Sequence, residues 1–135
     1  MCIFCKIIAG EIPSYKVYED EKILAFLDIK PLSPGHTLVI TKKHYQNIEE
    51  ISEEELSALI LAVKKIGHLL KTKLRIDGYN VSTNNDPVAG QEIPHIHFHI
   101  IPRSENDGHK PWSRCSCTDQ ELDDIVSKIT GQNGE

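Results

Sequence analysis

Apolar residues recur at two different spacings along this chain, and the longer spacing marks one long helix. Between residues 52 and 74 they fall every three or four positions, which places them on one face of an α-helix. Ser52 followed by Glu55 has the pattern of a capping box, in which each side chain bonds the other residue's backbone N–H. We therefore predict a helix from Ser52 to Leu74, with one face buried.

The shorter apolar runs alternate with polar residues or end at turn residues, as β-strands do. These runs lie on both sides of the long helix along the chain, which indicates an α+β fold with a mainly antiparallel five-stranded sheet. A second capping box, Thr118 with Glu121, predicts a C-terminal helix to about Thr130. The expected strands are residues 15–19, 22–28, 36–41, 79–83 and 95–101, and a short helix or turn is expected at residues 3–9.

The last of these strands carries histidine at every second position. Because successive side chains of a strand point to opposite faces, we expect His95, His97 and His99 in one row. The apolar residues between them then pack into the core. An imidazole titrates near neutral pH and can act as nucleophile, acid, base or metal ligand. The alternative is a partly exposed strand face that is histidine-rich by chance, which the strict alternation makes a poor explanation.

Composition and charge limit the classes of function. The 135 residues are 39% hydrophobic and 26% charged, and we expect them to form a single domain over residues 1–135. A net charge of -5 gives no electrostatic basis for a nucleic-acid surface. No apolar run approaches the ~20 residues that span a bilayer, and the first residues lack the pattern of a signal peptide. We therefore expect no membrane contact and a cytoplasmic location.

Cys2 and Cys5 have the spacing of half a zinc site, because two thiolates so spaced can share one tetrahedral ion. In a reducing compartment, cysteines are more often ligands or free thiols than disulfides. Spacing alone does not identify the second half of the site, and two unligated thiols are the alternative to any metal. The candidates for the second half are Cys115 with Cys117, or histidines such as His44 and His95.

Residues 95–101 fit the motif His-φ-His-φ-His-φ-φ, where φ is apolar, at every position. On this motif the chain resembles the histidine triad family. The resemblance covers most of residues 2–103, and residues 104–135 form a C-terminal extension that matches less clearly. The family resemblance implies a homodimer in which two sheets join into a larger one. The other matching segments are residues 2–8, 25–29, 34–40, 42–44 and 90–94.

The resemblance implies a nucleotidyl hydrolase or transferase that acts at the α-phosphate of nucleoside phosphoramidates or dinucleoside polyphosphates. His97 is the implied nucleophile, and water releases a purine nucleoside monophosphate, AMP or GMP, from the nucleotidyl-histidine. His99 is implied to bind phosphate oxygens on the same face. Asn84, Gln91 and nearby backbone N–H groups are implied to hold the phosphate and to stabilise its developing charge.

The resemblance also implies which residues contact the nucleoside. Asp28 resembles the carboxylate that accepts hydrogen bonds from the ribose hydroxyls; a strand-end Asp that caps the next turn is the alternative. Phe26 and Ile29 are implied to line an apolar, weakly selective base pocket, and plain core packing is the alternative for both. His36 is expected behind the phosphate site or, equally, as a hydrogen-bonded histidine at a strand start.

A metal site follows from the branch of the family that opens with Cys-x-x-Cys. For this chain the implied zinc ligands are Cys2, Cys5, His44 and His95. Four protein ligands leave no open position on the ion, so the implied Zn²⁺ is structural. Such an ion links the N-terminus to the histidine strand. The first histidine of the motif then binds the metal, while the other two act on the substrate.

One position departs from the family pattern. Some members have Ser or Thr where this chain has Glu92, and that hydroxyl helps to protonate the leaving group. The proton donor therefore stays open among Glu92, Gln91, His99 and water.

Two other interpretations of the chain's function stay open as well. One is a metal-dependent phosphohydrolase whose three histidines hold a catalytic ion, and the other is a nucleotide-binding protein with little turnover.

The C-terminal extension receives no role from the resemblance. Trp112 is expected near a partner subunit's site or, more ordinarily, in local core packing. Cys115 and Cys117 are expected as exposed thiols, and His68 and His109 as solvated side chains.

Overall fold

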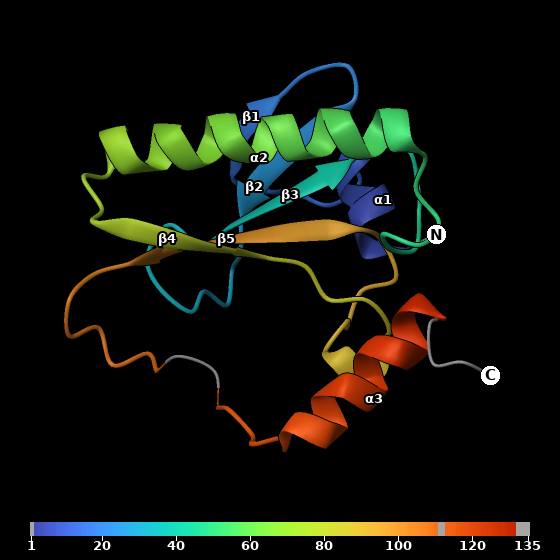
Figure 1. The fold of residues 1–135 in the computed structure, drawn as a ribbon. Coiled ribbons are helices and arrows are strands. Elements are labelled where there is room, and N and C mark those ends of the chain that lie inside the picture. Colours follow the sequence, from blue (N-terminus) through green and yellow to red (C-terminus); the bar gives the residue numbers. More distant parts are fainter. Residues whose placement is uncertain (1, 111–112, 132–135) are drawn as a thin grey trace.

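The fold is a single five-stranded antiparallel sheet with helices attached, as drawn in Figure 1 for a computed structural model that describes residues 2–110 and 113–131. The strand order across the sheet is β1-β2-β3-β5-β4. This architecture confirms the predicted α+β class. The strands are β1 (Lys16–Glu19), β2 (Ile23–Leu27), β3 (Thr37–Thr41), β4 (Gly78–Ser82) and β5 (His97–Arg103); the helices are α1 (Ile3–Ile8), α2 (Glu53–Lys73), α3 (Asp119–Thr130) and the short 3₁₀ turn η1 (Pro87–Ala89).

The two long helices begin at the residues that the sequence predicts. Ser52 caps α2, because its hydroxyl accepts the N–H of Glu55 at 3.2 Å. The reciprocal half of that box is not made, since the Glu55 carboxylate lies 3.7 Å from Lys22 Nζ. Thr118 and Glu121 form a complete capping box at the start of α3. The capping box predicted at Ser52 is therefore only half formed, because Glu55 pairs instead with Lys22, the residue before β2.

Helix α2 lies across one face of the sheet and buries its apolar stripe there (Figure 1). Strands β2, β3 and β5 supply the opposing side chains, which alternate along each strand with residues on the other face. Removing this apolar surface from water is the main force that holds the helix on the sheet. The buried residues of this layer are Ile23, Ala25, Val39, Tyr45, Leu59, Ala62, Val63, Ile66, Leu70, Ile96, Phe98 and Ile100.

The other face of the sheet carries a smaller apolar cluster and the histidines of β5. Helix α1 packs Phe4 and Ile7 against four strand residues, namely Leu24, Phe26, Leu38 and Ile40. His97 pairs with Ile40 across the sheet, and His99 pairs with Leu38. Directly paired residues of antiparallel strands point to the same face. His97 and His99 therefore continue the surface on which α1 sits.

Strand β5 begins at His97, two positions later than the sequence predicts. Its pairing with β3 ends at the pair of Ile40 and His97, because β3 ends one residue further on, at Thr41. Ile96 instead donates its N–H to the carbonyl of Tyr45 at 2.8 Å. His95 is consequently outside the ladder, and its side chain can leave the row of the other two histidines.

Helix α3 has little contact with the sheet. None of the residues described in α3 is buried, and α3 lies on the side of the sheet away from α2 (Figure 1). Cys115 and Cys117 are exposed thiols, as expected, whereas Trp112 lies outside the described residues. The apolar side chains that α3 exposes are Leu122, Ile125, Val126 and Ile129.

Among residues 2–110 and 113–131, no helix combines the length and the apolar character needed to cross a membrane.

Candidate functional site

The buried imidazole of His97 has one nitrogen engaged and one available. Its Nδ1 lies 2.7 Å from the carbonyl oxygen of His95, and a carbonyl can only accept a hydrogen bond. Nδ1 therefore carries the proton, which leaves the lone pair on Nε2. The Phe4 ring packs edge-on at 5.2 Å between centroids. Burial lowers the pKa of His97, against the raising effects of the His95 carbonyl and of the negative charges of Asp28 and Glu92. A neutral imidazole with a free Nε2 is a competent nucleophile.

His99 stands beside His97, with 5.0 Å between the ring centroids, and its own proton is placed by a second chain of hydrogen bonds. The N–H of Leu32 donates to His36 Nδ1 at 3.1 Å, so the proton of a neutral His36 is on Nε2. That Nε2 lies 2.9 Å from His99 Nδ1, which must then accept. The proton of His99 is left on Nε2, where it can be donated to a ligand.

Burial keeps this pair of rings neutral. It lowers the pKa of His99 to about 4, and charge on His97 and His36 adds to the effect. The pKa of His36 is also lowered by burial, which outweighs the attraction of the Asp28 carboxylate. The site can therefore offer a hydrogen-bond donor to an anion near neutral pH without holding a buried positive charge.

Asp28 follows β2 and is half-buried at the edge of the histidine cluster. Its Oδ1 accepts the N–H of Lys30 at 2.9 Å, which is the turn-capping contact. Its Oδ2 lies 3.8 Å from His36 Nε2. The carboxylate thus caps a turn and also faces the site, so the two interpretations of this residue are compatible.

The two residues expected to line a base pocket differ in their surroundings. Phe26 is buried in the apolar cluster, with its ring 5.5 Å from that of Phe4 in an edge-on arrangement. Ile29 is 78% exposed, beyond the end of β2. An exposed Ile29 is free to contact a ligand, while Phe26 contributes chiefly to the core beneath the histidines.

Gln91 is buried, and backbone groups occupy its side-chain amide. Its Nε2 donates to the carbonyls of Gln46 and Ile93 at 2.6 and 3.1 Å, and its Oε1 accepts the N–H of Asp86 at 2.8 Å. Asn47 adds a longer contact of 3.5 Å to the same oxygen. These bonds tie the loop after β3 to the loop before β5. The structure does not bring the Gln91 amide into the group formed by His97 and His99.

Asn84 and Glu92 lie at the two ends of the loop that precedes β5. Asn84 is half-buried and donates to the carbonyl of Gly90 at 3.4 Å, and Gly90 adopts a φ of +95° that favours glycine. Glu92 is exposed, and its charge is close enough to raise the pKa of His97. The charge of Glu92 thus acts on the reacting group from the loop before β5.

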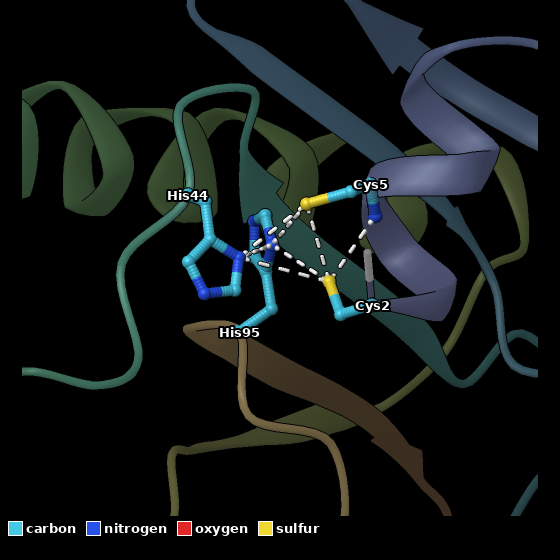
Figure 2. Close-up of side chains that lie close together, drawn as sticks. All are labelled: Cys2, Cys5, His44 and His95. Carbon is cyan, nitrogen blue, oxygen red and sulfur yellow. Dashed lines mark hydrogen bonds between the residues drawn. The ribbon is translucent and has the colours of Figure 1, made fainter.

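A second cluster adjoins the first, formed by Cys2 and Cys5 with His44 and His95 (Figure 2). Cys2 caps α1, because its sulfur accepts the N–H of Cys5 at 3.3 Å. His95 Nε2 lies 2.7 Å from the carbonyl of Thr41 and must donate to it. The lone pair of His95 is then on Nδ1, which points toward the two sulfurs (Figure 2). Burial raises the pKa of the Cys5 thiol.

The four donor atoms of this cluster fit a tetrahedral metal ion. The two sulfurs are 3.2 Å apart, the two Nδ1 atoms are 3.1 Å apart, and the four sulfur–nitrogen distances run from 3.4 to 3.7 Å. A tetrahedral zinc ion with thiolate and imidazole ligands separates its donors by about 3.3–3.8 Å, so the four sulfur–nitrogen distances match and the sulfur–sulfur and nitrogen–nitrogen distances are shorter. The donor set and its shape suit Zn²⁺. Cys115 and Cys117 are exposed and do not belong to this group.

The sequence does not identify the backbone groups that determine which ring nitrogen of each histidine carries the proton. The Thr41 carbonyl, the His95 carbonyl and the Leu32 N–H each select one tautomer of a histidine. The sequence holds one signal for them, the rigid loop Pro31–Gly35, whose Gly35 has a φ of +93°. No side-chain pattern distinguishes these peptide groups from their neighbours.

Comparison with known proteins identifies relatives of this chain. The HIT domain family model matches residues 9–106. An uncharacterized HIT-like protein of Methanocaldococcus jannaschii is 53% identical over 131 residues, which cover 97% of this chain and all of that protein (100%). Adenosine 5'-monophosphoramidase HNT1 of Candida albicans is 44% identical over 108 residues, which cover 77% of this chain and 71% of that protein.

Solved structures give the same result for the fold. The crystal structure of a member of the HIT family from Bacillus subtilis superposes with a TM-score of 0.88 at 43% sequence identity and covers 99% of this chain and 98% of its own. The family model, the curated relatives and the fold agree, and the chain belongs to the HIT, or histidine triad, family.

Proposed function

We propose that this chain is a nucleotidyl hydrolase or transferase that cleaves at the α-phosphate of nucleoside phosphoramidates or dinucleoside polyphosphates. Its relative in Candida albicans is, by its name, an adenosine 5'-monophosphoramidase, which supports hydrolysis of a nucleotide derivative. One observation carries the proposal. His97 gives its Nδ1 proton to a backbone carbonyl and keeps a free lone pair on Nε2, and its ring lies beside that of His99, whose Nε2–H is a hydrogen-bond donor.

The proposed reaction has two displacements at phosphorus. His97 Nε2 attacks the α-phosphorus, the P–N or P–O bond to the leaving group breaks, and the leaving group takes a proton. Water then attacks the nucleotidyl-imidazole, the P–Nε2 bond breaks, and a nucleoside monophosphate departs. The covalent intermediate divides one difficult displacement into these two easier ones. His97 begins and ends the cycle in the same protonation state.

The neighbouring residues hold the nucleotide and its protons. His99 donates Nε2–H to a non-bridging phosphate oxygen, which stabilises negative charge in both displacements. Asp28 accepts the ribose hydroxyls on Oδ2, since its Oδ1 is already occupied. Asn84 donates to the phosphate, and exposed Ile29 packs on a purine base of an AMP or GMP moiety. Glu92, or a water molecule bound to it, gives the leaving group its proton in the first displacement and takes one from the attacking water in the second, which restores its starting state.

We also propose that Cys2, Cys5, His44 and His95 hold a structural Zn²⁺. Their four donor atoms converge on one point, and the four sulfur–nitrogen distances of 3.4–3.7 Å suit a tetrahedral site. With all four positions filled by protein, the ion supplies rigidity and takes no part in the displacement. His95 gives this rigidity to the reaction site, because its backbone carbonyl holds the His97 proton.

A homodimer is part of the proposal, since the family resemblance implies one. The described fold leaves surfaces that a second copy can cover. Strand β4 is at an edge of the sheet with Val81 exposed, and α2 exposes Ile60 and Leu61. Sedimentation equilibrium of the full chain tests this, and a mass of a single chain at micromolar concentration would contradict it.

A catalytic metal is the second candidate, and one observation favours it at a ligand set other than the row of His95, His97 and His99. Asp28, His36 and His99 each offer a ligand atom within 4.8 Å of the others. The hydrogen bonds of these residues argue against it, because Leu32 N–H occupies His36 Nδ1 and forces a proton onto the Nε2 that would have to bind the ion.

Trapping the covalent intermediate tests the proposal. Radiolabelled adenosine 5'-phosphoramidate is mixed with the full chain, quenched in base, and digested. We expect a labelled peptide that carries AMP on His97, and no label on the His97→Asn variant. In oxygen-18-labelled water, a substrate with a chiral α-phosphorothioate should give net retention from two inversions. Net inversion, with no adduct on a chain that turns over, would remove the proposal and favour direct attack by water.

A further inference from the structure

The segment that follows β5 reaches back to the histidine site through His109, a residue expected only to be solvated. His109 Nε2 lies 2.7 Å from the carbonyl oxygen of Leu32 and must donate to it. Leu32 in turn donates its N–H to His36, and His36 donates to His99. His109 is therefore the outermost member of a hydrogen-bonded chain that ends at a residue of the site.

The backbone of His109 is held firmly enough to serve as an anchor. The Asp107 carboxylate accepts Arg103 Nε and Nη2 at 2.7 and 3.1 Å, and it also accepts the N–H groups of Ser104 and His109 at 3.2 and 3.0 Å. Arg103 Nη2 donates further to the His109 carbonyl at 2.8 Å. Arg103 Nη1 reaches Asn80 on β4 at 2.7 Å. The turn is thus fixed to the edge strand of the sheet.

Leu32 depends on such tethers, because packing does little to hold it. Its side chain is 57% exposed. The neighbouring Ser33 donates its hydroxyl to the carbonyl of Pro102 in β5 at 2.7 Å, and the His109 contact links this loop to the segment after β5. The N–H of Leu32 is the group that decides which nitrogen of His36 carries the proton.

We propose that His109 is a positioning residue for the histidine site. By holding the Leu32 carbonyl it keeps the Leu32 N–H on His36 Nδ1, which keeps the His36 proton on Nε2 and the His99 proton on the side that faces a ligand. Its effect on turnover rests on the proposed function. Its effect on the tautomers of His36 and His99 does not.

Nitrogen NMR of the full chain measures those tautomers directly. The variants are His109→Leu, which removes the donor and keeps much of the volume, and His109→Gln, whose amide Nε2 can donate from a similar reach. His68→Gln, on the exposed side of α2, is the matched control. We expect His36 and His99 as pure Nε2–H forms in the native chain, mixed forms in His109→Leu, and the pure forms again in His109→Gln and His68→Gln. Retained amide spectra of β5 and α2 establish that each variant folds.

Kinetics on adenosine 5'-phosphoramidate give the second readout. Loss of one net hydrogen bond predicts a fall in kcat of about twofold to tenfold for His109→Leu with KM nearly unchanged, and recovery in His109→Gln. Pure Nε2–H forms in His109→Leu would overturn the proposal, as would a His109→Gln variant as impaired as His109→Leu. If the native chain has no such turnover but the tautomers shift as expected, the proposed function fails and the positioning role stands.

Discussion

His97 donates its Nδ1 proton to the backbone carbonyl of His95 across 2.7 Å, and this bond joins the two clusters of the site. The side chain of His95 faces the cysteines, while its carbonyl fixes the tautomer of His97. His95 is itself outside β5 and is held by the carbonyl of Thr41. A change at the cysteine cluster can therefore alter the orientation of His97 without any contact to the reacting atoms.

Replacing His97 by Asn tests the nucleophile. Asn keeps a polar side chain able to bond the His95 carbonyl but has no nucleophilic nitrogen. We expect kcat on adenosine 5'-phosphoramidate to fall by roughly a thousandfold or more, because the covalent step is lost. The thermal midpoint and the affinity for AMP should change little. A variant that retains turnover within about tenfold of the native rate would contradict the assignment.

Replacing Asp28 by Ala tests the ribose contact. Loss of hydrogen bonds to a charged acceptor should weaken AMP binding by roughly tenfold to a hundredfold. Binding of 2',3'-dideoxy-AMP should change much less, since it lacks the donors. Calorimetric titration of both ligands measures the difference, with Asp77→Ala, an exposed carboxylate, as the control. Equal losses for the two ligands would assign Asp28 to turn capping alone.

The secondary structure could be predicted because local patterns determine it. The stripe and cap of α2, and the complete box of Thr118 and Glu121, are visible within a few residues. The errors lie where a distant segment decides. Strand β5 starts late because β3 ends at Thr41, and Glu55 leaves its capping box for Lys22. Neither partner can be identified from the spacing.

Which residues form the site could be predicted from the sequence, but several of the contacts that they make could not. The resemblance gathers Cys2, Cys5, His44 and His95 into one set, and the structure brings these four together. It also assigns Gln91 to the phosphate, but tertiary packing buries that amide between two loops, where three backbone groups and the Asn47 side chain contact it. The role of Gln91 on substrate stays a prediction that this geometry does not favour.

Replacing Cys5 by Ser tests the structural metal. We expect the zinc content per chain to fall and the thermal midpoint to drop by roughly 5–15 °C, because the binding free energy of a structural ion is folding free energy. Cys115→Ser is the matched control, since this thiol is exposed and outside the cluster. Metal analysis and calorimetry on the same samples measure both quantities. Native zinc content in Cys5→Ser would exclude Cys5 as a ligand.

The stability of the fold should depend on pH through His99. Burial lowers its pKa to about 4 in the folded chain, whereas an unfolded histidine has a pKa near ~6.5. Below about pH 6.5 the unfolded chain takes up a proton that the folded chain refuses, so the unfolding free energy falls as the pH falls toward 4. The contribution of neutral His99 is complete above about pH 6.5.

Chemical unfolding at a series of pH values measures this effect. We expect His99→Asn to lose less stability than the native chain between about pH 6.5 and pH 4. Part of the slope should survive in the variant, because burial lowers the pKa of His36 in the same direction and acid also weakens a cysteine–histidine metal site. His68→Gln, exposed on α2, should keep the native slope. An equal slope for His99→Asn and the native chain would mean that His99 does not stay neutral because of its burial.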